Sequence, residues 1–149
     1  MEYDSYSPDG TFELAKKLGQ EAKAGDVVCL IGDLGVGKTL FSQGFAKGLG
    51  IEEYVNSPTF TIVQEYEGID DRKLTLYHFD VYRIEDSEEM EEVGFTDVIY
   101  GNGVSLIEWA DMISDILPEK YTRVTIEKEL DKGFDYRKIT VEHVGGYIQ

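Results

Sequence analysis

The chain has 149 residues, the size of one domain, with 30 acidic and 14 basic side chains and a formal net charge of −16. Such a charge repels nucleic-acid phosphates and anionic lipid, so direct RNA binding and membrane binding are disfavoured, whereas docking onto a basic protein is favoured. The one cysteine, Cys29, excludes an internal disulfide. No secretory signal and no apolar run of about 20 residues is present, so we expect a cytoplasmic location.

The first predicted helix follows the capping and turn residues 7–11 and ends at Gly25. Its apolar side chains recur at helical spacing: Leu14, Ala15, Leu18 and Ala22. The apolar run 27–31 then predicts a buried strand.

The segment 32–39 fits the phosphate-binding pattern G-x-x-x-x-G-K-[ST] at every constrained position. It follows the predicted strand and opens an amphipathic helix that runs from about Lys38 to Gly50. Glycines let backbone N–H groups wrap a phosphate, the Lys38 ammonium can reach the β and γ groups, and the Thr39 hydroxyl can bind Mg²⁺. The pattern predicts a nucleoside triphosphate site with these contacts: Gly32, Asp33, Leu34, Gly35, Val36, Gly37, Lys38, Thr39 and Leu40.

Segments 59–66 and 73–80 are rich in β-branched and aromatic residues and predict a hairpin. The residues that begin it, 56–60, lie about twenty positions past the P-loop, where many nucleotide switches sense the γ-phosphate. Thr59 is the natural sensor in that reading. A proline turn that simply starts the hairpin explains the same residues equally well.

Two acids end apolar strands after the P-loop: Asp80 follows 76–79, and Glu108 follows 104–107. A P-loop site normally recruits an acid from a neighbouring strand, because Mg²⁺ prefers oxygen ligands. Glu108 is the better candidate for the metal, whereas Asp80 could bind a metal-bound water or orient the attacking one. Acids also end strands for purely structural reasons, so spacing leaves both roles open.

The other segments predict structural roles. The acidic run 85–92 is typical of a solvated helix face capped by Asp86 or Ser87, and two alternating runs, 123–127 and 137–142, predict strands joined by a turn. His78 and His143 lack partners at metal-ligand spacing, so we expect core or surface roles for both.

These motifs, in this order, resemble the TsaE family (formerly YjeE), the small P-loop ATPases of bacterial tRNA threonylcarbamoyladenosine synthesis. The resemblance covers nearly the whole chain and rests on the P-loop together with 57–60, 77–83, 94–95 and 104–109. It implies an α/β fold in one P-loop domain, residues 1–149, with a mixed central sheet that includes a β-hairpin and is flanked by helices.

The resemblance also implies site residues. Lys38 would contact the ATP phosphates, with Thr39 and Glu108 at Mg²⁺. Asp80 resembles the family's second acid, and Thr59 falls in its switch-like loop. The family's nucleotide contacts further nominate Thr11 and Arg137. One departure from the family pattern is Val36, where alanine is more usual, and its side chain should point away from the phosphates.

Proteins of this family act with TsaD and TsaB in the complex that modifies adenosine 37 of tRNAs reading codons that begin with A. The transfer chemistry resides in TsaD, and the TsaE-like subunit couples ATP binding and hydrolysis to cycling of the complex, meeting tRNA only indirectly. No arginine lies in a motif that assigns it to transition-state charge, so we expect slow Mg-dependent hydrolysis that partners stimulate.

Two other functions fit the P-loop. A small-molecule kinase would need an acceptor pocket and an arginine-bearing lid, which the few scattered arginines and the central hairpin fit poorly. A nucleotide-dependent scaffold would bind ATP and dock without turnover. Alanine at Glu108 or Asp80 should spare such a scaffold, whereas alanine at Lys38 should abolish function in every case.

Overall fold

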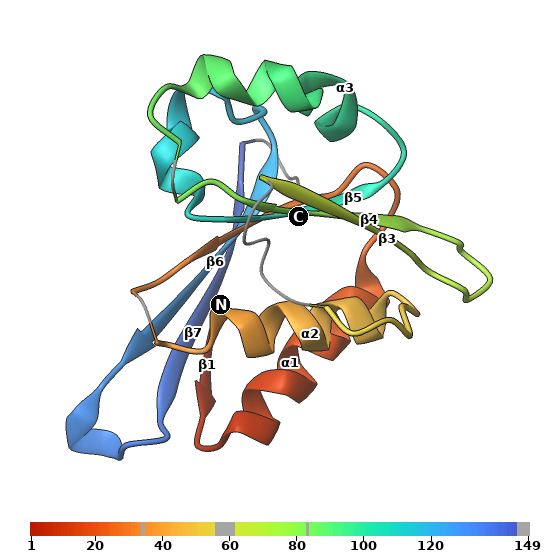
Figure 1. The fold of residues 1–149 in the computed structure, drawn as a ribbon. Helices are drawn as coiled ribbons and strands as arrows, with labels where there is room; N and C mark the ends of the chain where they lie inside the picture. Colours follow the sequence, from red (N-terminus) through yellow and green to blue (C-terminus); the bar gives the residue numbers. More distant parts are fainter. Residues whose placement is uncertain (34, 56–61, 83, 146–149) are drawn as a thin grey trace.

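The computed structural model describes residues 1–33, 35–55, 62–82 and 84–145. Within them, seven strands form one mixed sheet in the order β1-β7-β6-β2-β5-β4-β3 (Figure 1). β2 runs parallel to β5 and β6, and β4 runs parallel to β5, whereas the other neighbours pair antiparallel. The strands are β1 (Glu2–Ser5), β2 (Val27–Ile31), β3 (Val63–Glu67), β4 (Thr75–Asp80), β5 (Val104–Glu108), β6 (Tyr121–Lys128) and β7 (Arg137–Val144).

Helices cover both faces of this sheet (Figure 1). On one face lie α1 (Pro8–Glu21) and α2 (Lys38–Gly48), and on the other lie the 3-10 helix η1 (Ser87–Val93), α3 (Phe95–Ile99) and the 3-10 helix η2 (Ala110–Ile116). A last short turn, η3 (Leu130–Lys132), joins β6 to β7. The expected α/β fold with a mixed sheet, a hairpin and flanking helices is confirmed.

The buried strand β2 divides the interior into two hydrophobic cores. Its side chains alternate between faces, so Val28 and Leu30 pack in the core beneath α1 and α2, whereas Val27 and Cys29 pack in the core beneath η1, α3 and η2. Because both faces of this central strand are covered, its sequence is a continuous apolar run. The P-loop thus leaves a strand that is fixed from both sides.

Arg72, in the turn between β3 and β4, ties that hairpin to the two helices beside it. Its guanidinium donates to the carbonyl oxygen of Gly48 at the end of α2, at 2.8 Å, and pairs with Asp70 at 2.7 Å. It also donates to carbonyl oxygens at the end of α1, those of Gly19, Gln20 and Ala22. Carbonyls at helix C-termini lack partners within the helix, so one cation here stabilises the ends of both helices.

Most predicted elements are confirmed, but α1 ends at Glu21 rather than at Gly25, α3 was not expected, and further differences concern β1, the acidic segment and the hairpin. β1 was not expected, because Tyr3 is the only apolar side chain among its four residues and one such residue shows no alternation; it forms a strand by pairing with β7. The acidic segment forms a 3-10 helix, η1, capped by Asp86 through a capping box, with Met90 buried beneath it. The hairpin is present, but β3 is described only from Val63.

Within the described residues, no helix has both the length and the apolar composition needed to cross a bilayer.

Candidate functional site

Three of the parallel strands, β2, β5 and β4, end at the same edge of the sheet and bring the P-loop and the two predicted acids together. The P-loop leaves β2 after Ile31, Glu108 ends β5, and Asp80 ends β4. Asp80 lies opposite Glu108 in the register of β4 and β5, and Glu108 lies opposite Leu30 on β2. Ligands of open α/β sheets bind at the carboxyl ends of strands, so this edge is the candidate site.

The P-loop requires glycine for two different reasons. Gly35 and Gly37 have φ angles of 80° and 106°, which L side chains rarely adopt. Gly32 is limited by space, because a Cβ there would lie 2.8 Å from the carbonyl oxygen of Ile126. Gly37 is also the N-cap of α2, so the first N–H groups of that helix, from Lys38 onward, have no partner within the helix. This is a ready site for an anion.

Lys38 is the first residue of α2, and its side chain folds back against the P-loop. Its Nζ donates to the carbonyl oxygen of Gly32 at 2.5 Å, and the residue is only 7% exposed. Burial lowers the pKa of the Lys38 ammonium, while the nearby carboxylates of Glu108 and Asp80 oppose that shift. The cation expected to meet phosphates thus lies in the electrostatic field of both candidate acids.

Trp109 contacts the P-loop lysine, a role that the sequence analysis did not assign to it. Its backbone adopts φ 63° and ψ 35°, the left-handed region that is costly for a bulky residue. In this conformation its ring lies under the Lys38 ammonium, 3.4 Å from Nζ, and packs against Tyr82 with ring centroids 4.7 Å apart. The available signal was its position directly after the acid that ends β5.

His78 is buried in the core, as one of the two expected roles allows, but it also reaches the site. Its Nε2 lies 2.6 Å from Oε2 of Glu108, and the two residues are 0% and 2% exposed. The sequence signal was alternation: His78 and Asp80 are two positions apart on β4 and therefore share a face of the sheet.

Asp80 lies half-buried at the end of β4. Burial raises the pKa of its carboxyl, as does the nearby charge of Glu108, while the backbone N–H of Tyr82, which donates to Oδ1 at 3.1 Å, lowers it. A carboxyl group whose pKa is raised in this way is suited to exchanging a proton or orienting water.

Of the two nucleotide contacts that the resemblance nominated, Arg137 lies at the P-loop and Thr11 does not. Arg137 reaches the P-loop, because its Nε donates to the carbonyl oxygen of Val36 at 2.8 Å. Thr11 is buried at the start of α1, and its hydrogen bonds go to Ser5 and Ser7 rather than to the loop. The Val36 side chain lies in the core between the sheet and α1 and α2. Leu34 and Thr59 lie outside the described residues.

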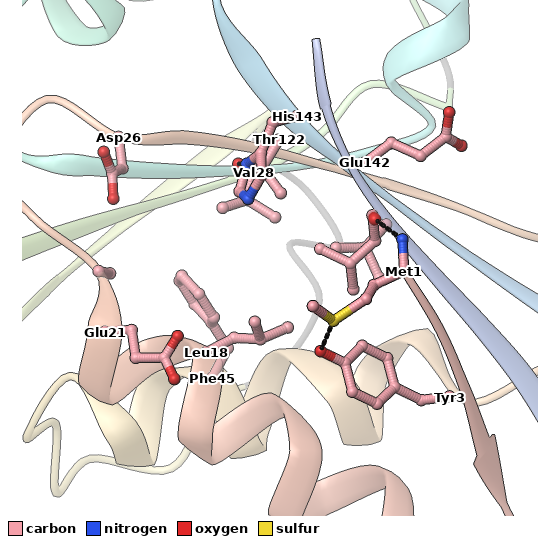
Figure 2. A pocket seen from close by; sticks show the side chains of 13 residues that line it. Met1, Tyr3, Leu18, Glu21, Asp26, Val28, Phe45, Thr122, Glu142 and His143 are labelled. Carbon is pink, nitrogen blue, oxygen red and sulfur yellow. Dashed lines mark hydrogen bonds between the residues drawn. The ribbon is translucent and has the colours of Figure 1, made fainter. Parts of the chain in front are cut away.

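The described residues form two hollows of similar volume on different parts of the surface. One of about 500 Å³ lies beside the P-loop and is lined by Ile31–Asp33, Val36 and residues 125–128 of β6. The other, of about 490 Å³, lies between the sheet and the helices α1 and α2. Figure 2 shows Leu18 and Phe45 on its helical side and Val28 and Thr122 on its sheet side. Its lining includes no residue of the P-loop, whereas that of the first hollow includes Gly32, Asp33 and Val36, so the first hollow is the one adjacent to the P-loop.

The residues at the sheet edge suit a magnesium ion shared with a nucleotide. In the part of the chain that the structure describes, no group of three or more His, Cys, Asp or Glu side chains could hold a metal by itself. Mg²⁺ typically takes one or two carboxylates, while water and substrate phosphates complete its octahedron. Glu108, Asp80 and the hydroxyl of Thr39 at the start of α2 offer oxygen ligands of that kind.

The sequence of this chain is similar to that of known proteins. Residues 5–139 match the family model described as "Threonylcarbamoyl adenosine biosynthesis protein TsaE". The chain is 46% identical over 145 residues to a protein of Bacillus subtilis named "tRNA threonylcarbamoyladenosine biosynthesis protein TsaE", covering 97% of this chain and 87% of that one. A protein of the same name from Treponema pallidum is 39% identical over 137 residues, covering 92% and 96%.

A solved structure agrees with the sequence relatives. The crystal structure of YdiB from Bacillus subtilis superposes with a TM-score of 0.77 at 38% sequence identity, covering 98% of this chain and 86% of that chain.

Proposed function

Because this chain belongs to the TsaE family of threonylcarbamoyl adenosine biosynthesis proteins, we propose that it is the ATP-binding and slowly ATP-hydrolysing subunit of that tRNA modification machinery. The observation that carries the proposal is the meeting of the P-loop lysine, Lys38, with the strand-end acids Glu108 and Asp80. A phosphate cradle beside two carboxylates is what hydrolysis of a metal-bound triphosphate requires.

Each residue has a defined task in the proposed reaction. Lys38 and the N–H groups of the loop bind the phosphate oxygens, and Thr39 and Glu108 hold Mg²⁺. The ion, when bound, neutralises charge on the β and γ phosphates. Asp80 orients a water for attack on the γ-phosphorus. The new P–O bond forms as the bond to the bridging oxygen breaks, and one proton of the water passes to an oxygen of the transferred phosphate, which yields ADP and phosphate.

The arginines of the chain support slow turnover by the isolated protein. Arg72 is bound to helix ends, Arg123 pairs with Glu142 on the surface, and Arg137 holds the backbone of the P-loop. Among the described arginines, therefore, each already has contacts that a role in transition-state charge would break. We propose that TsaD and TsaB complete the site, and a net charge of −16 favours docking onto a more basic surface.

These arginine contacts also argue against the kinase alternative. A kinase lid closes over the phosphates with arginines, yet Arg72 and Arg123 are engaged elsewhere.

The test is Mg·ATP hydrolysis by the purified chain, alone and with an added TsaD-TsaB pair. We compare the unchanged chain with Glu108→Ala and with Asp97→Ala, an exposed acid on α3 that serves as the matched control. We expect the pair to stimulate hydrolysis in the unchanged chain and in Asp97→Ala, and Glu108→Ala to lose the response.

Three results would contradict the proposal. Fast turnover by the chain alone would favour a kinase or a self-sufficient ATPase. Tight ATP binding with no hydrolysis in the presence of the partners would favour the scaffold. No ATP binding would exclude all three functions.

A further inference from the structure

The contact between His78 and Glu108 joins two buried polar side chains from neighbouring strands. His78 points from the middle of β4, Glu108 ends β5, and Nε2 lies 2.6 Å from Oε2. Both residues are nearly inaccessible, at 0% and 2% exposure. A carboxylate withdrawn from water to this extent requires donors that replace its hydration.

The two ring nitrogens of His78 have different surroundings. Nδ1 is buried and has no hydrogen-bond partner among the described residues, whereas Nε2 faces the carboxylate. A neutral imidazole carries one N–H and one lone pair, and an unpaired buried N–H is rarer than an unpaired acceptor. We therefore assign the proton to Nε2, which donates to Oε2 of Glu108.

We infer that His78 is a positioning residue: its Nε2–H fixes the orientation of the Glu108 carboxylate, and metal affinity at the nucleotide site depends on that contact. The inference rests on the proposed function, in which Glu108 holds Mg²⁺. Side chains that hydrogen-bond metal-ligating groups fix the orientation of the ligand, and their loss typically costs about 10- to 100-fold in metal affinity.

Stability alone does not account for the pair. Replacing a buried ionic or polar pair by apolar residues of similar volume is often neutral or stabilising. The apolar side chains that share this face of the sheet with His78, such as Leu76 and Leu106, show that apolar side chains fit these strands. A histidine at this position is explained by what it does for Glu108.

The experiment measures metal binding rather than activity. Mn²⁺ replaces Mg²⁺, and the free Mn²⁺ signal in electron paramagnetic resonance gives the affinity of the ATP-loaded protein for the ion. ATP affinity is measured separately in EDTA. Four chains are compared: the unchanged protein, His78→Gln, His78→Asn and His143→Gln, which changes the other histidine of the chain, exposed on β7.

The two substitutions at His78 differ in reach. The glutamine amide nitrogen can occupy the place of Nε2, whereas the asparagine nitrogen falls nearer the place of Nδ1. We expect His78→Asn to weaken Mn²⁺ binding about 10- to 100-fold, while His78→Gln and His143→Gln stay close to the unchanged chain. ATP affinity in EDTA should be similar in all four, because no metal ligand is needed there.

Equal Mn²⁺ affinity for His78→Asn and His78→Gln would overturn the inference, as would a parallel fall of ATP affinity in EDTA, which would mark a general structural defect. If the unchanged chain fails to bind Mn²⁺ with ATP, the proposed function itself is wrong and the inference falls with it.

Discussion

The Lys38 ammonium lies 3.4 Å from the centroid of the Trp109 ring. The same Nζ donates to the carbonyl oxygen of Gly32, so this ammonium contacts both a ring face and a backbone oxygen. A cation over an aromatic face gains about 0.5–2 kcal/mol. Phosphate groups offer stronger charge-assisted bonds, so nucleotide binding should draw Lys38 away from the ring.

This contact predicts a fluorescence signal for ATP binding. Trp109 is the only tryptophan of the chain, so emission excited at the indole band reports on this ring alone. We expect the intensity or the emission maximum to change when ATP is titrated into the protein, because the ammonium beside the ring moves to the phosphates. The titration also yields the dissociation constant.

Lys38→Ala is the control for that signal. It should alter the emission before any ligand is added and should abolish the response to ATP. A response of the unchanged size in Lys38→Ala would show that the signal does not arise from the Lys38 contact.

Arg72 predicts a stability effect far from the site. Its guanidinium bonds carbonyl oxygens at the ends of both α1 and α2. Removing it leaves several partly buried acceptors without a donor, so we expect Arg72→Ala to lower the free energy of unfolding by about 2–3 kcal/mol. Chemical denaturation measures the change.

Arg123→Ala is the matched control, because Arg123 forms one exposed pair with Glu142 at 3.1 Å. Such surface pairs contribute about 0–1 kcal/mol. Equal losses in the two variants would contradict the assignment of Arg72 as the link between hairpin and helices.

Much of this architecture follows from local patterns. The apolar run of β2, the glycines of the P-loop and the β-branched and aromatic residues of β3 and β4 each act within a few residues, and the sequence therefore predicted them. The candidate acids were found for the same reason: Asp80 and Glu108 directly follow apolar runs.

The features that the sequence did not predict depend on the order of the strands in the sheet and on contacts between neighbouring strands. Nothing local shows that β5 lies between β2 and β4, which is why His78 could not be linked to Glu108 before the fold was known. Similarly, β1 is a strand because β7 pairs with it, and its four residues, with Tyr3 as the one apolar side chain, carry no alternation of their own.

The burial of Cys29 predicts a thiol that does not react with disulfide reagents in the folded chain. It is fully buried in the middle of β2, and burial raises the pKa of the thiol to about 12 from 9.0. Only the thiolate attacks disulfide reagents, and at pH 8 a pKa near 12 leaves about 0.01% of it, against about 10% for the ordinary thiol. We expect Ellman's reagent to leave the folded chain unlabelled from pH 7 to pH 9.

The same protein unfolded in guanidinium is the control, and it should react at once with one equivalent. Prompt labelling of the folded chain would mean that β2 opens readily, which its position between two cores argues against.

Arg137 predicts how β7 supports the nucleotide site. Its Nε donates to the carbonyl oxygen of Val36 in the P-loop, while its Nη1 donates to the carbonyl oxygens of Phe134 and Tyr136, at 2.9 and 2.8 Å. The planar guanidinium thereby fixes the loop to the turn before β7. Loss of one charge-assisted hydrogen bond costs about 1.5 kcal/mol, so Arg137→Ala should weaken ATP binding about tenfold.

Two further variants separate loop support from simple charge. Lys138→Ala removes the neighbouring cation, whose Nζ lies 3.6 Å from Glu2, and should leave ATP affinity unchanged. Arg137→Lys keeps the positive charge but cannot make three bonds from one plane, so it should resemble Arg137→Ala if the arginine acts by holding the loop. Full affinity in Arg137→Lys would instead indicate a charge interaction with the nucleotide, and full affinity in Arg137→Ala would remove this residue from the site.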